Sequence, residues 1–258
     1  MTSPLVAGLR LGAFVAVTLP LMPLQQVFIW CWPALARRFP MHYHRLVLRL
    51  IGVKLRIVGA PAAGPALIVS NHVSWLDIVA LSAAVPCSFI AKREVGTWPF
   101  FGSLARLQRT VFIHRDRRHE AGKSRDAVRE RLNAGDTLVL FAEGTSSDGL
   151  RVLPFKSALF AAADLSGVDV QPVTLAHLGH RHLPMPRRLR PFYAWYGGMD
   201  LAPHLWQALR AGPIEMVLIR HPPLRFDAGG DRKRLSREAE KAVRRGLVQA
   251  LHRPGELG

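Results

Sequence analysis

The feature that most constrains this chain is an apolar stretch near its N-terminus, Leu11–Ala36, which contains no charged residue. A helix of this length can cross the hydrocarbon core of a bilayer, which is about 30 Å thick. Pro20 and Pro23 allow two arrangements: one kinked helix that spans the bilayer, or a hairpin of two short helices that enters and leaves on one side. A buried core helix is the alternative, although uncharged stretches of this length are rare in soluble domains.

The charges that flank this stretch predict its orientation. Only Arg10 precedes it, whereas several cations follow it: Arg37, Arg38, Arg45, Arg49 and Lys54. Basic residues stay on the cytoplasmic side of a membrane segment, so we expect the rest of the chain at the cytoplasmic face of the inner membrane. Trp30 and Trp32 are expected to lie at the membrane–water interface.

The overall charge narrows the class of partner. The chain has 35 Lys and Arg against 18 Asp and Glu, a formal net charge of +17. A field of this sign attracts nucleic acid, acidic lipid headgroups or an acidic carrier protein, and charge alone does not choose among them. The two cysteines, Cys31 and Cys87, give neither a disulfide framework nor a zinc-binding spacing, which fits a reducing compartment.

After the apolar stretch, short β-branched runs alternate with helical patterns. We expect strands at Lys54–Val58, Ala66–Ser70, Ser88–Ala91, Val111–His114, Thr137–Phe141, Val170–Leu175 and Met216–Arg220. Helices are expected at Trp75–Val85, Pro99–Gln108, Arg118–Ala134 and Phe155–Leu165. This alternation predicts an α/β fold with a mixed or mostly parallel sheet flanked by helices. We expect residues 1–40 to anchor the chain in a membrane, residues 41–225 to form the α/β domain, and His180–Pro191 to be a basic, flexible loop within it.

The C-terminal part, residues 226–258, is expected to contain a basic helix over Asp231–Arg253. Small and apolar residues line one side of it, and arginines and lysines crowd the rest. Two interpretations remain open: a surface helix that lies on anionic lipid, or a docked terminal helix whose charged face is solvated.

A polar cluster follows one of the apolar strands. Ala66–Ser70 runs directly into Asn71 and His72, and Asp77 lies five residues after the histidine. Side chains five apart on one ideal helix diverge by about 140°, so these two meet only if His72 precedes the helix and Asp77 lies in its first turn. We expect Ser70 or Asn71 to cap that helix. Asp77 would then orient one imidazole nitrogen and leave the other as a general base, although such a pair taken alone is more often structural.

A second cluster follows another buried strand, Thr137–Phe141. Glu143 stands at the strand exit, and Gly144 lets backbone amides approach a ligand closely. Thr145 and Ser146 add hydroxyl groups. An ordinary Ser/Gly turn has the same composition, so the interpretation as a site depends on the two clusters together.

Together the clusters resemble the signature blocks of the glycerolipid acyltransferases, the lysophosphatidate-type family. Asn71, His72 and Asp77 resemble the first block, and the run from Phe141 to Thr145 resembles the third. The second and fourth blocks are similar to these segments, in the same order: Ala91–Glu94 with Pro99–Gly102, Phe112–Arg115, and Val170–Val173. The resemblance covers roughly residues 67–175, and the joint match is much more specific than any single motif.

The resemblance implies an enzyme that transfers an acyl chain from a thioester, on acyl carrier protein or coenzyme A, to the hydroxyl group of a membrane lysolipid. His72 is then the general base and Asp77 fixes its tautomer. The candidates for positioning the substrate are Asn71, Glu143, Gly144, Thr145 and Ser146. Lys92 and Arg115 are candidates for binding an anionic headgroup or the phosphopantetheine, with solvated charges as the alternative. Neither a metal nor a cofactor beyond the thioester is implied.

One position departs from the family pattern and bears on the acceptor. The third block usually carries an arginine where this chain has Ser146, and a guanidinium grips phosphate in a way that a hydroxyl does not. The segments around it are similar to the bacterial branch that acylates lyso-ornithine lipid: Glu143–Gly149, Leu153–Ala158, Trp195–Asp200 and Pro203–Trp206. Lyso-ornithine lipid is therefore the favoured acceptor and lysophosphatidate the alternative, since Arg115, Arg151 or Lys156 could supply another phosphate grip.

Other classes of function fit the residues less well. His177, His180 and His182 have no carboxylate or cysteine nearby in the sequence to complete a metal site, so we assign them to the basic loop. A nucleic-acid-binding protein would explain the charge, but no nucleic-acid motif is recognisable and the apolar N-terminus favours lipid. A membrane-surface protein without catalysis is the third alternative. The sequence does not indicate an oligomeric state.

Overall fold

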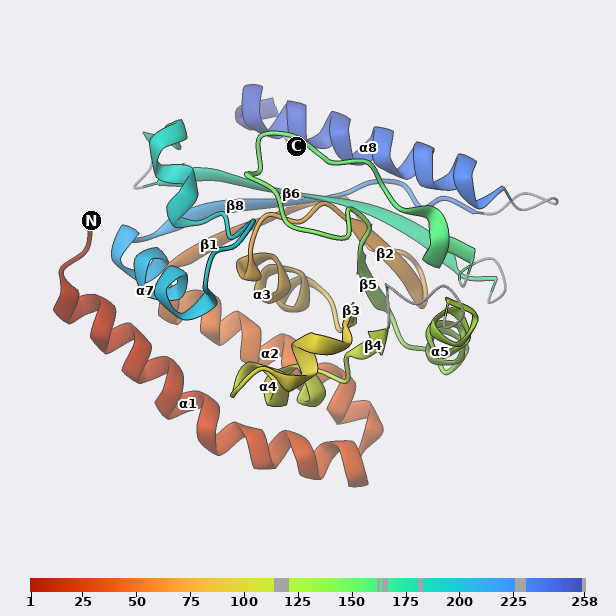
Figure 1. The fold of residues 1–258 in the computed structure, drawn as a ribbon, viewed down its shortest axis with the longest axis horizontal. Coiled ribbons are helices and arrows are strands. Elements are labelled where there is room, and N and C mark those ends of the chain that lie inside the picture. The colour runs from red at the N-terminus through yellow and green to blue at the C-terminus, as the bar shows by residue number, and fades with distance from the viewer. Residues whose placement is uncertain (114–120, 162, 164–166, 181–182, 226–230, 257–258) are drawn as a thin grey trace.

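The computed structural model describes residues 1–113, 121–161, 163, 167–180, 183–225 and 231–256. Its sheet consists of β1 (Val53–Val58), β2 (Ala66–Ser70), β3 (Ser88–Lys92), β4 (Val111–Ile113), β5 (Leu138–Phe141), β6 (Asp169–His180), β7 (Leu183–Pro184) and β8 (Ile214–Arg220). The strand order is β1-β8-β6-β2-β5-β3-β4, with β7 beside β6. All pairs are parallel except that β6 runs antiparallel to β7 and β8. The predicted α/β class with a mixed, mostly parallel sheet is confirmed (Figure 1).

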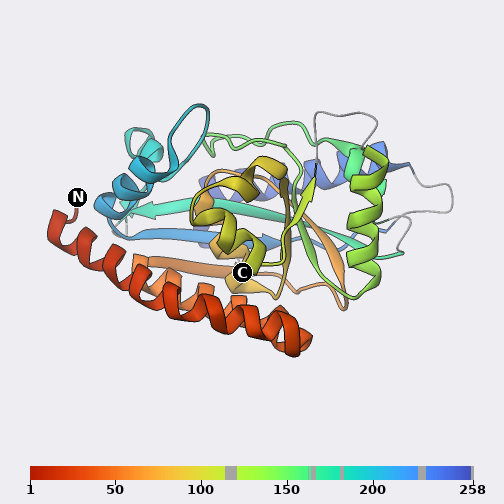
Figure 2. The same cartoon turned by 60° about the horizontal axis from the view of Figure 1, so that its bottom comes forward.

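Helices cover both faces of this sheet. They are α1 (Pro4–Cys31), α2 (Pro33–Ile51), α3 (Trp75–Ala84), α4 (Phe101–Leu107), α5 (Ala121–Asn133), α7 (Leu201–Ala211) and α8 (Arg232–His252), with 3-10 helices η1 (Arg93–Thr97), η3 (Ser157–Phe160), η4 (Arg187–Phe192) and η5 (Pro254–Glu256). In Figures 1 and 2, α1, α2 and α3 lie on one side of the sheet and α8 on the other. β2 is buried along its whole length because its side chains alternate between the two cores: Ile68 packs with α3, whereas Leu67 and Val69 pack with α5 and α8.

The N-terminal segment is a hairpin of two helices, and its turn is not at the prolines that the sequence suggested. α1 continues through both Pro20 and Pro23 and ends at Trp32, whose φ of −139° is extended. Pro33 follows, and a residue that precedes proline disfavours the helical conformation. α2 then begins at Pro33 and runs to Ile51, so the division expected between residues 40 and 41 falls inside it.

α1 is long and apolar enough to cross a membrane, by length and composition, and only 11% of its most apolar window is buried in the protein. A core helix of a soluble domain would be mostly buried. Its outward side chains are large and apolar, among them Leu5, Leu9, Leu19, Trp30 and Trp32. Such an exposed apolar surface is typical of a site that contacts lipid or another protein.

The later elements differ from expectation in three places. The segment His180–Pro191 is not a loop throughout, because β6 extends to His180 and both β7 and most of η4 follow. The helix expected over Phe155–Leu165 begins only at Ser157, as η3, and the Phe155 amide before it donates to Glu240 Oε2 of α8 at 2.8 Å. α7 was not expected from the sequence.

The C-terminal helix α8 is docked on the sheet, as the second interpretation of it expects. Its small and apolar side chains are buried, most of them against β6: Leu235, Ala239, Ala242, Val243, Gly246, Leu247 and Ala250. An added Cβ on Gly246 would lie 2.4 Å from Thr174 Oγ1, which shows how closely helix and strand approach. These side chains are therefore not available to enter a lipid layer.

Candidate active site

His72 and Asp77 meet at the junction between β2 and α3. His72 precedes the helix, Asp77 lies in its first turn, and His72 Nδ1 is 2.9 Å from Asp77 Oδ2. The helix is capped by Ser74, not by Ser70 or Asn71 as expected. Ser74 and Asp77 form a capping box, in which the Ser74 amide donates to Asp77 Oδ2 at 2.8 Å. The carboxylate thus starts the helix and holds the imidazole at the same time.

Asp77 is fully buried and has two further donors. The Val73 amide donates to Oδ2 at 2.6 Å, and His177 Nε2 lies 3.1 Å from Oδ1. Burial alone would raise the pKa of this carboxyl, but the hydrogen bonds and charges of His177 and His72 outweigh it and hold the pKa well below its usual range. Asp77 is therefore ionised at neutral pH, and because a carboxylate only accepts, each imidazole donates to it.

The ring of His72 is fixed on one face and open at one edge. It stacks on Phe141 of β5, with ring centroids 3.8 Å apart and planes 16° from parallel. With Nδ1 held by Asp77, Nε2 is left to act, and no described residue forms a hydrogen bond with it. The side chain retains 14% exposure, so a substrate hydroxyl can reach this nitrogen. These are the orientation and the free nitrogen that a general base needs.

The backbone around His72 is held by residues that the sequence did not single out. The Ser147 amide donates to the His72 carbonyl at 2.9 Å, and the Trp195 amide donates to the Val73 carbonyl at 2.9 Å. The buried Ser147 hydroxyl also lies 3.3 Å from the His72 carbonyl. These contacts tie the His72 turn to the loop after β5 and to the segment before α7.

Glu143 is buried beside the backbone of His72. Its Oε1 accepts the His72 amide at 3.3 Å, whereas its Oε2 is buried without a hydrogen-bond partner among the described residues. Burial raises the pKa of Glu143 to about 8, and the negative charge of Asp77 adds to this, against the opposing effect of the amides of His72 and Leu153. Glu143 is therefore largely protonated near neutral pH, and of the two carboxyl groups in contact with His72, Asp77 is the ionised one.

The other predicted substrate-binding residues fall into two groups. Asn71 is buried and pairs with the backbone of Leu175 in both directions, at 2.9 Å each, so its amide joins β2 to β6 and is not free for substrate. Gly144 has a φ of +76° and lies against the Lys156 side chain, since an added Cβ would be 2.7 Å from Lys156 Nζ. Thr145 is exposed and Ser146 is half-buried beside it. The loop therefore presents hydroxyls and one nearby ammonium group.

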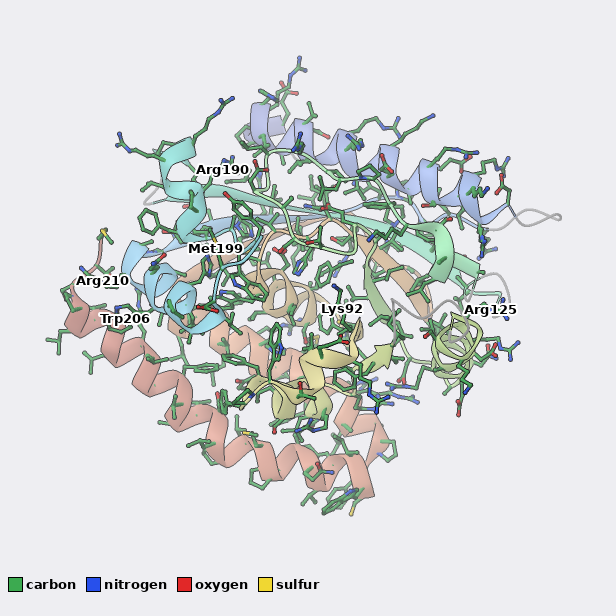
Figure 3. The ribbon with its side chains drawn as sticks, in the orientation of Figure 1. Lys92, Arg125, Arg190, Met199, Trp206 and Arg210 are labelled. Carbon is green, nitrogen blue, oxygen red and sulfur yellow. The ribbon has the colours of Figure 1, made fainter. Side chains whose placement is uncertain are left out.

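The two predicted basic residues are not part of this cluster as described. Lys92 is exposed at the end of β3 (Figure 3), and Arg115 lies outside the described residues. Arg190 of η4, which the sequence did not indicate, instead reaches the loop after β5, with its NH1 3.5 Å from the Gly149 carbonyl. Burial lowers the pKa of this guanidinium, although not enough to discharge it.

An apolar cavity of ≈ 220 Å³ lies on the α1 side of the site. Helices α1, α2, α3, α4 and α7 contribute to its lining, which includes Leu11, Phe14, Val47, Trp75, Phe89 and Leu205. Phe89 connects it to the base, because its ring lies 6.1 Å from Phe141, on which His72 stacks. A long apolar chain placed in this cavity would bring its polar end towards His72.

The geometry is suited to proton transfer between the His72 imidazole and a neutral group beside an apolar chain. Among the described residues, no group of three or more histidine, cysteine, aspartate or glutamate side chains could hold a metal ion. His177, which we had assigned to a loop with His180 and His182, belongs to β6 and contacts Asp77.

Comparisons with known proteins agree with the resemblance in the sequence. The acyltransferase family model matches residues 54–176. A lyso-ornithine lipid O-acyltransferase of Brucella abortus is 46% identical over 251 residues, which cover 94% of each chain. A 1-acyl-sn-glycerol-3-phosphate acyltransferase of Neisseria meningitidis is 39% identical over 64% of each chain.

The fold has a solved counterpart. The crystal structure of the 1-acyl-sn-glycerophosphate acyltransferase of Thermotoga maritima matches with a TM-score of 0.63 at 24% identity, over 83% of this chain and 79% of that chain. The similarity to the Brucella protein extends over nearly the whole chain and confirms the expectation of an enzyme over that of a binding protein. This chain is an acyltransferase and belongs to the acyltransferase family.

Proposed function

We propose that this chain is a membrane-bound lysolipid O-acyltransferase whose favoured acceptor is lyso-ornithine lipid. The observation that carries the proposal is the buried Asp77 holding His72 beside an apolar cavity large enough to take part of an acyl chain. The name of the Brucella relative supports the acceptor. So does Ser146, which cannot grip a phosphate as an arginine would.

In the proposed reaction His72 Nε2 takes the proton of the acceptor hydroxyl while the oxygen attacks the thioester carbonyl carbon. The new C–O bond forms, the C–S bond breaks, and the imidazolium returns the proton to the leaving sulfur. The products are an ester and a free thiol, and His72 is neutral again. Asp77 stabilises the imidazolium between these steps. The donor is an acyl thioester of acyl carrier protein or coenzyme A, and Glu143, Gly144, Thr145 and Ser146 position the acceptor.

The helical hairpin supports attachment to the cytoplasmic face of the inner membrane. Two hydrogen bonds tie this segment to the α/β domain: just before α1 the Thr2 amide donates to the Arg210 carbonyl at 2.7 Å, and within α1 Gln25 Nε2 donates to the Leu107 carbonyl at 2.9 Å. A helix held along the domain in this way favours insertion into one leaflet over a span across both. The cavity beneath it would then open towards the lipid substrates.

A second acceptor, lysophosphatidate, is favoured by one specific observation. The Lys156 ammonium lies against Gly144, where it could bind a phosphate in place of the missing arginine. The Neisseria relative bears the name of such an enzyme.

The test is a competition assay with the purified chain in detergent. Labelled acyl-acyl carrier protein is supplied with equal amounts of lyso-ornithine lipid and lysophosphatidate. We expect product mainly on lyso-ornithine lipid, and a loss of about 10²–10⁴-fold for His72→Ala in a folded protein. Product mainly on lysophosphatidate would favour the second acceptor. Substantial activity of folded His72→Ala would contradict the role of His72.

A further inference from the structure

The outer surface of α8 is a basic face. Its exposed cations are Arg232, Lys233, Arg234, Arg237, Lys241, Arg244 and Arg245. Glu238 and Glu240 compensate part of this charge: Arg234 lies 3.7 Å from Glu238 and Arg244 lies 2.8 Å from Glu240. Within the described part of the chain, no acidic side chain forms an ion pair with Lys233, Lys241 or Arg245. The basic face of α8 is therefore a surface of strong positive charge with little apolar area.

This basic face adjoins the catalytic loop. The Phe155 amide donates to Glu240 Oε2 at 2.8 Å, and the next residue, Lys156, donates its amide to the Ala142 carbonyl at 2.8 Å. Glu143 follows and accepts the His72 amide at 3.3 Å. A short chain of direct contacts thus leads from the middle of α8 to the base.

The cations of the catalytic loop extend the same surface. Arg151 and Lys156 are both exposed, and Lys156 lies against Gly144. A macromolecule that binds the basic face of α8 would therefore contact the loop that carries Glu143, at the polar side of His72.

If the chain is attached to the membrane through α1, the basic face is turned away from that membrane. α8 and α1 lie on opposite faces of the sheet in both views (Figures 1 and 2). α1 bears the exposed apolar side chains that would enter lipid, so α8 faces away from that surface. The apolar side chains of α8 are packed against β6.

We propose that the basic face of α8, with Arg151 and Lys156, docks the acidic carrier protein that bears the acyl thioester. This rests on the proposed acyltransferase function. Opposite charge steers such a partner to the surface and sets its orientation. The carrier would then deliver its prosthetic arm from the polar side of His72, while the acyl chain enters the apolar cavity on the other side.

The experiment compares donors that carry the same acyl chain on acyl carrier protein, coenzyme A or pantetheine. The variant tested carries both Arg237→Glu and Lys241→Glu in the full chain, and it is assayed beside the wild type in detergent at low salt. We expect KM for the carrier-protein donor to rise about tenfold or more, with kcat within about twofold. Activity with the pantetheine donor should not change, and added salt should remove most of the difference.

A matched control reverses the same number of charges on the same face of the sheet. Lys54→Glu/Arg56→Glu alters two exposed residues of the edge strand β1. Because Arg56 also donates to the Pro254 carbonyl at 2.7 Å, the melting temperature is measured with it, and we expect KM for every donor to be unchanged. Arg237→Gln/Lys241→Gln should show a smaller rise in KM with a normal melting temperature, which separates lost docking from misfolding.

Each other outcome overturns the docking surface. Equal losses with carrier-protein and pantetheine donors would place the effect in the catalytic site. A rise in KM for both the carrier-protein and the coenzyme A donor, but not for the pantetheine donor, would indicate that the basic face recognises a phosphate group. Unchanged kinetics with weaker binding to anionic vesicles or to duplex DNA would assign the face to those partners. No activity of the wild-type chain with any donor would instead refute the proposed function, and the docking proposal with it.

Discussion

α8 packs against β6 through small side chains that leave no space, whereas α1 lies on the other face of the sheet over an apolar cavity of ≈ 220 Å³. The outer surfaces of these helices differ as well: α8 is covered with cations, and α1 exposes large apolar residues such as Leu5 and Trp30. His72 lies between the two regions. On the proposed function, the donor's polar carrier and the lipid chains would approach His72 from opposite sides.

Along β6, successive side chains point to opposite faces of the sheet. Its side chains alternate, so that His177 points to Asp77 on the α3 face, and Thr174 contacts His221 and the Val243 carbonyl on the α8 face. Both are buried polar groups with satisfied hydrogen bonds, but only His177 touches the catalytic pair. β6 therefore carries two comparable buried polar contacts, one to Asp77 at the site and one to the backbone of α8.

We expect the largest difference in kcat between variants on the two faces of the sheet at His177, which lies on the α3 face. His177→Leu removes the donor to Asp77 Oδ1, so the carboxylate is less firmly held against His72. Loss of a hydrogen bond to a charged group costs about 1.5–3 kcal/mol, so we expect kcat to fall about 10–100-fold with KM nearly unchanged. His177→Gln keeps an N–H donor and should recover most of kcat. The measurement is steady-state kinetics with both variants.

Thr174→Val is the control on the same strand. It removes a buried hydroxyl from the α8 face, and we expect kcat within about twofold of the wild type. If His177→Gln were as inactive as His177→Leu, or if Thr174→Val lost as much activity, the effect would be structural and His177 would have no special role in positioning Asp77.

A smaller effect, on the free energy of unfolding, is expected from the different packing of α8 and α1. Gly246→Ala in α8 would place a Cβ 2.4 Å from Thr174 Oγ1 and 2.7 Å from His221 Nε2, whereas a Cβ at Gly12 in α1 has nothing within 4 Å. Overpacking costs about 1–3 kcal/mol, so we expect Gly246→Ala to lower the free energy of unfolding. Gly12→Ala should raise it by about 0.5–1 kcal/mol through helix propensity. Thermal unfolding in detergent measures both, and a neutral Gly246→Ala would refute close packing of α8.

The strands were predictable because they are apolar runs between turns, and β2 matches its expected bounds at Ala66 and Ser70. α2 was not predictable, because Pro40 and the arginines of this segment interrupt the apolar pattern of a helix. The helix buries only part of its surface, and it packs against α3. The turn at Trp32 could have been found from Pro33, which restricts the residue before it.

The candidate site was predictable only where its residues are close in the sequence. His72 and Asp77 follow from local spacing, and the Ser74 cap could have been found from the same Ser-x-x-Asp pattern. His177 contacts Asp77 across a separation of 100 residues along the chain, and Ser147 contacts the His72 carbonyl across 75 residues. Only the parallel pairing of β2 with β6 and β5 brings them there.

The last effect, a pH dependence of stability, is expected at Glu143, on the boundary between the two regions. Burial raises the pKa of Glu143 to about 8, above the ordinary value of about 4.3 that it has when unfolded. The folded state therefore holds a proton that the unfolded chain loses, and stability declines as pH rises from about 4.3 through 8. Glu143→Gln removes this dependence while keeping an oxygen for the His72 amide.

We therefore expect the melting temperature of Glu143→Gln to match the wild type near pH 4.5 and to exceed it by a growing margin up to about pH 8, the pKa of Glu143 in the fold, where the margin levels off. Glu238→Gln on α8, where the carboxyl is exposed and lies 3.7 Å from Arg234, is the matched Glu-to-Gln control measured over the same pH range. A wild type that gains stability relative to Glu143→Gln over this range would mean that Glu143 is ionised in the fold. Two negative carboxylates would then flank His72, and the polar side of the base would carry a charge that opposes an incoming acidic carrier.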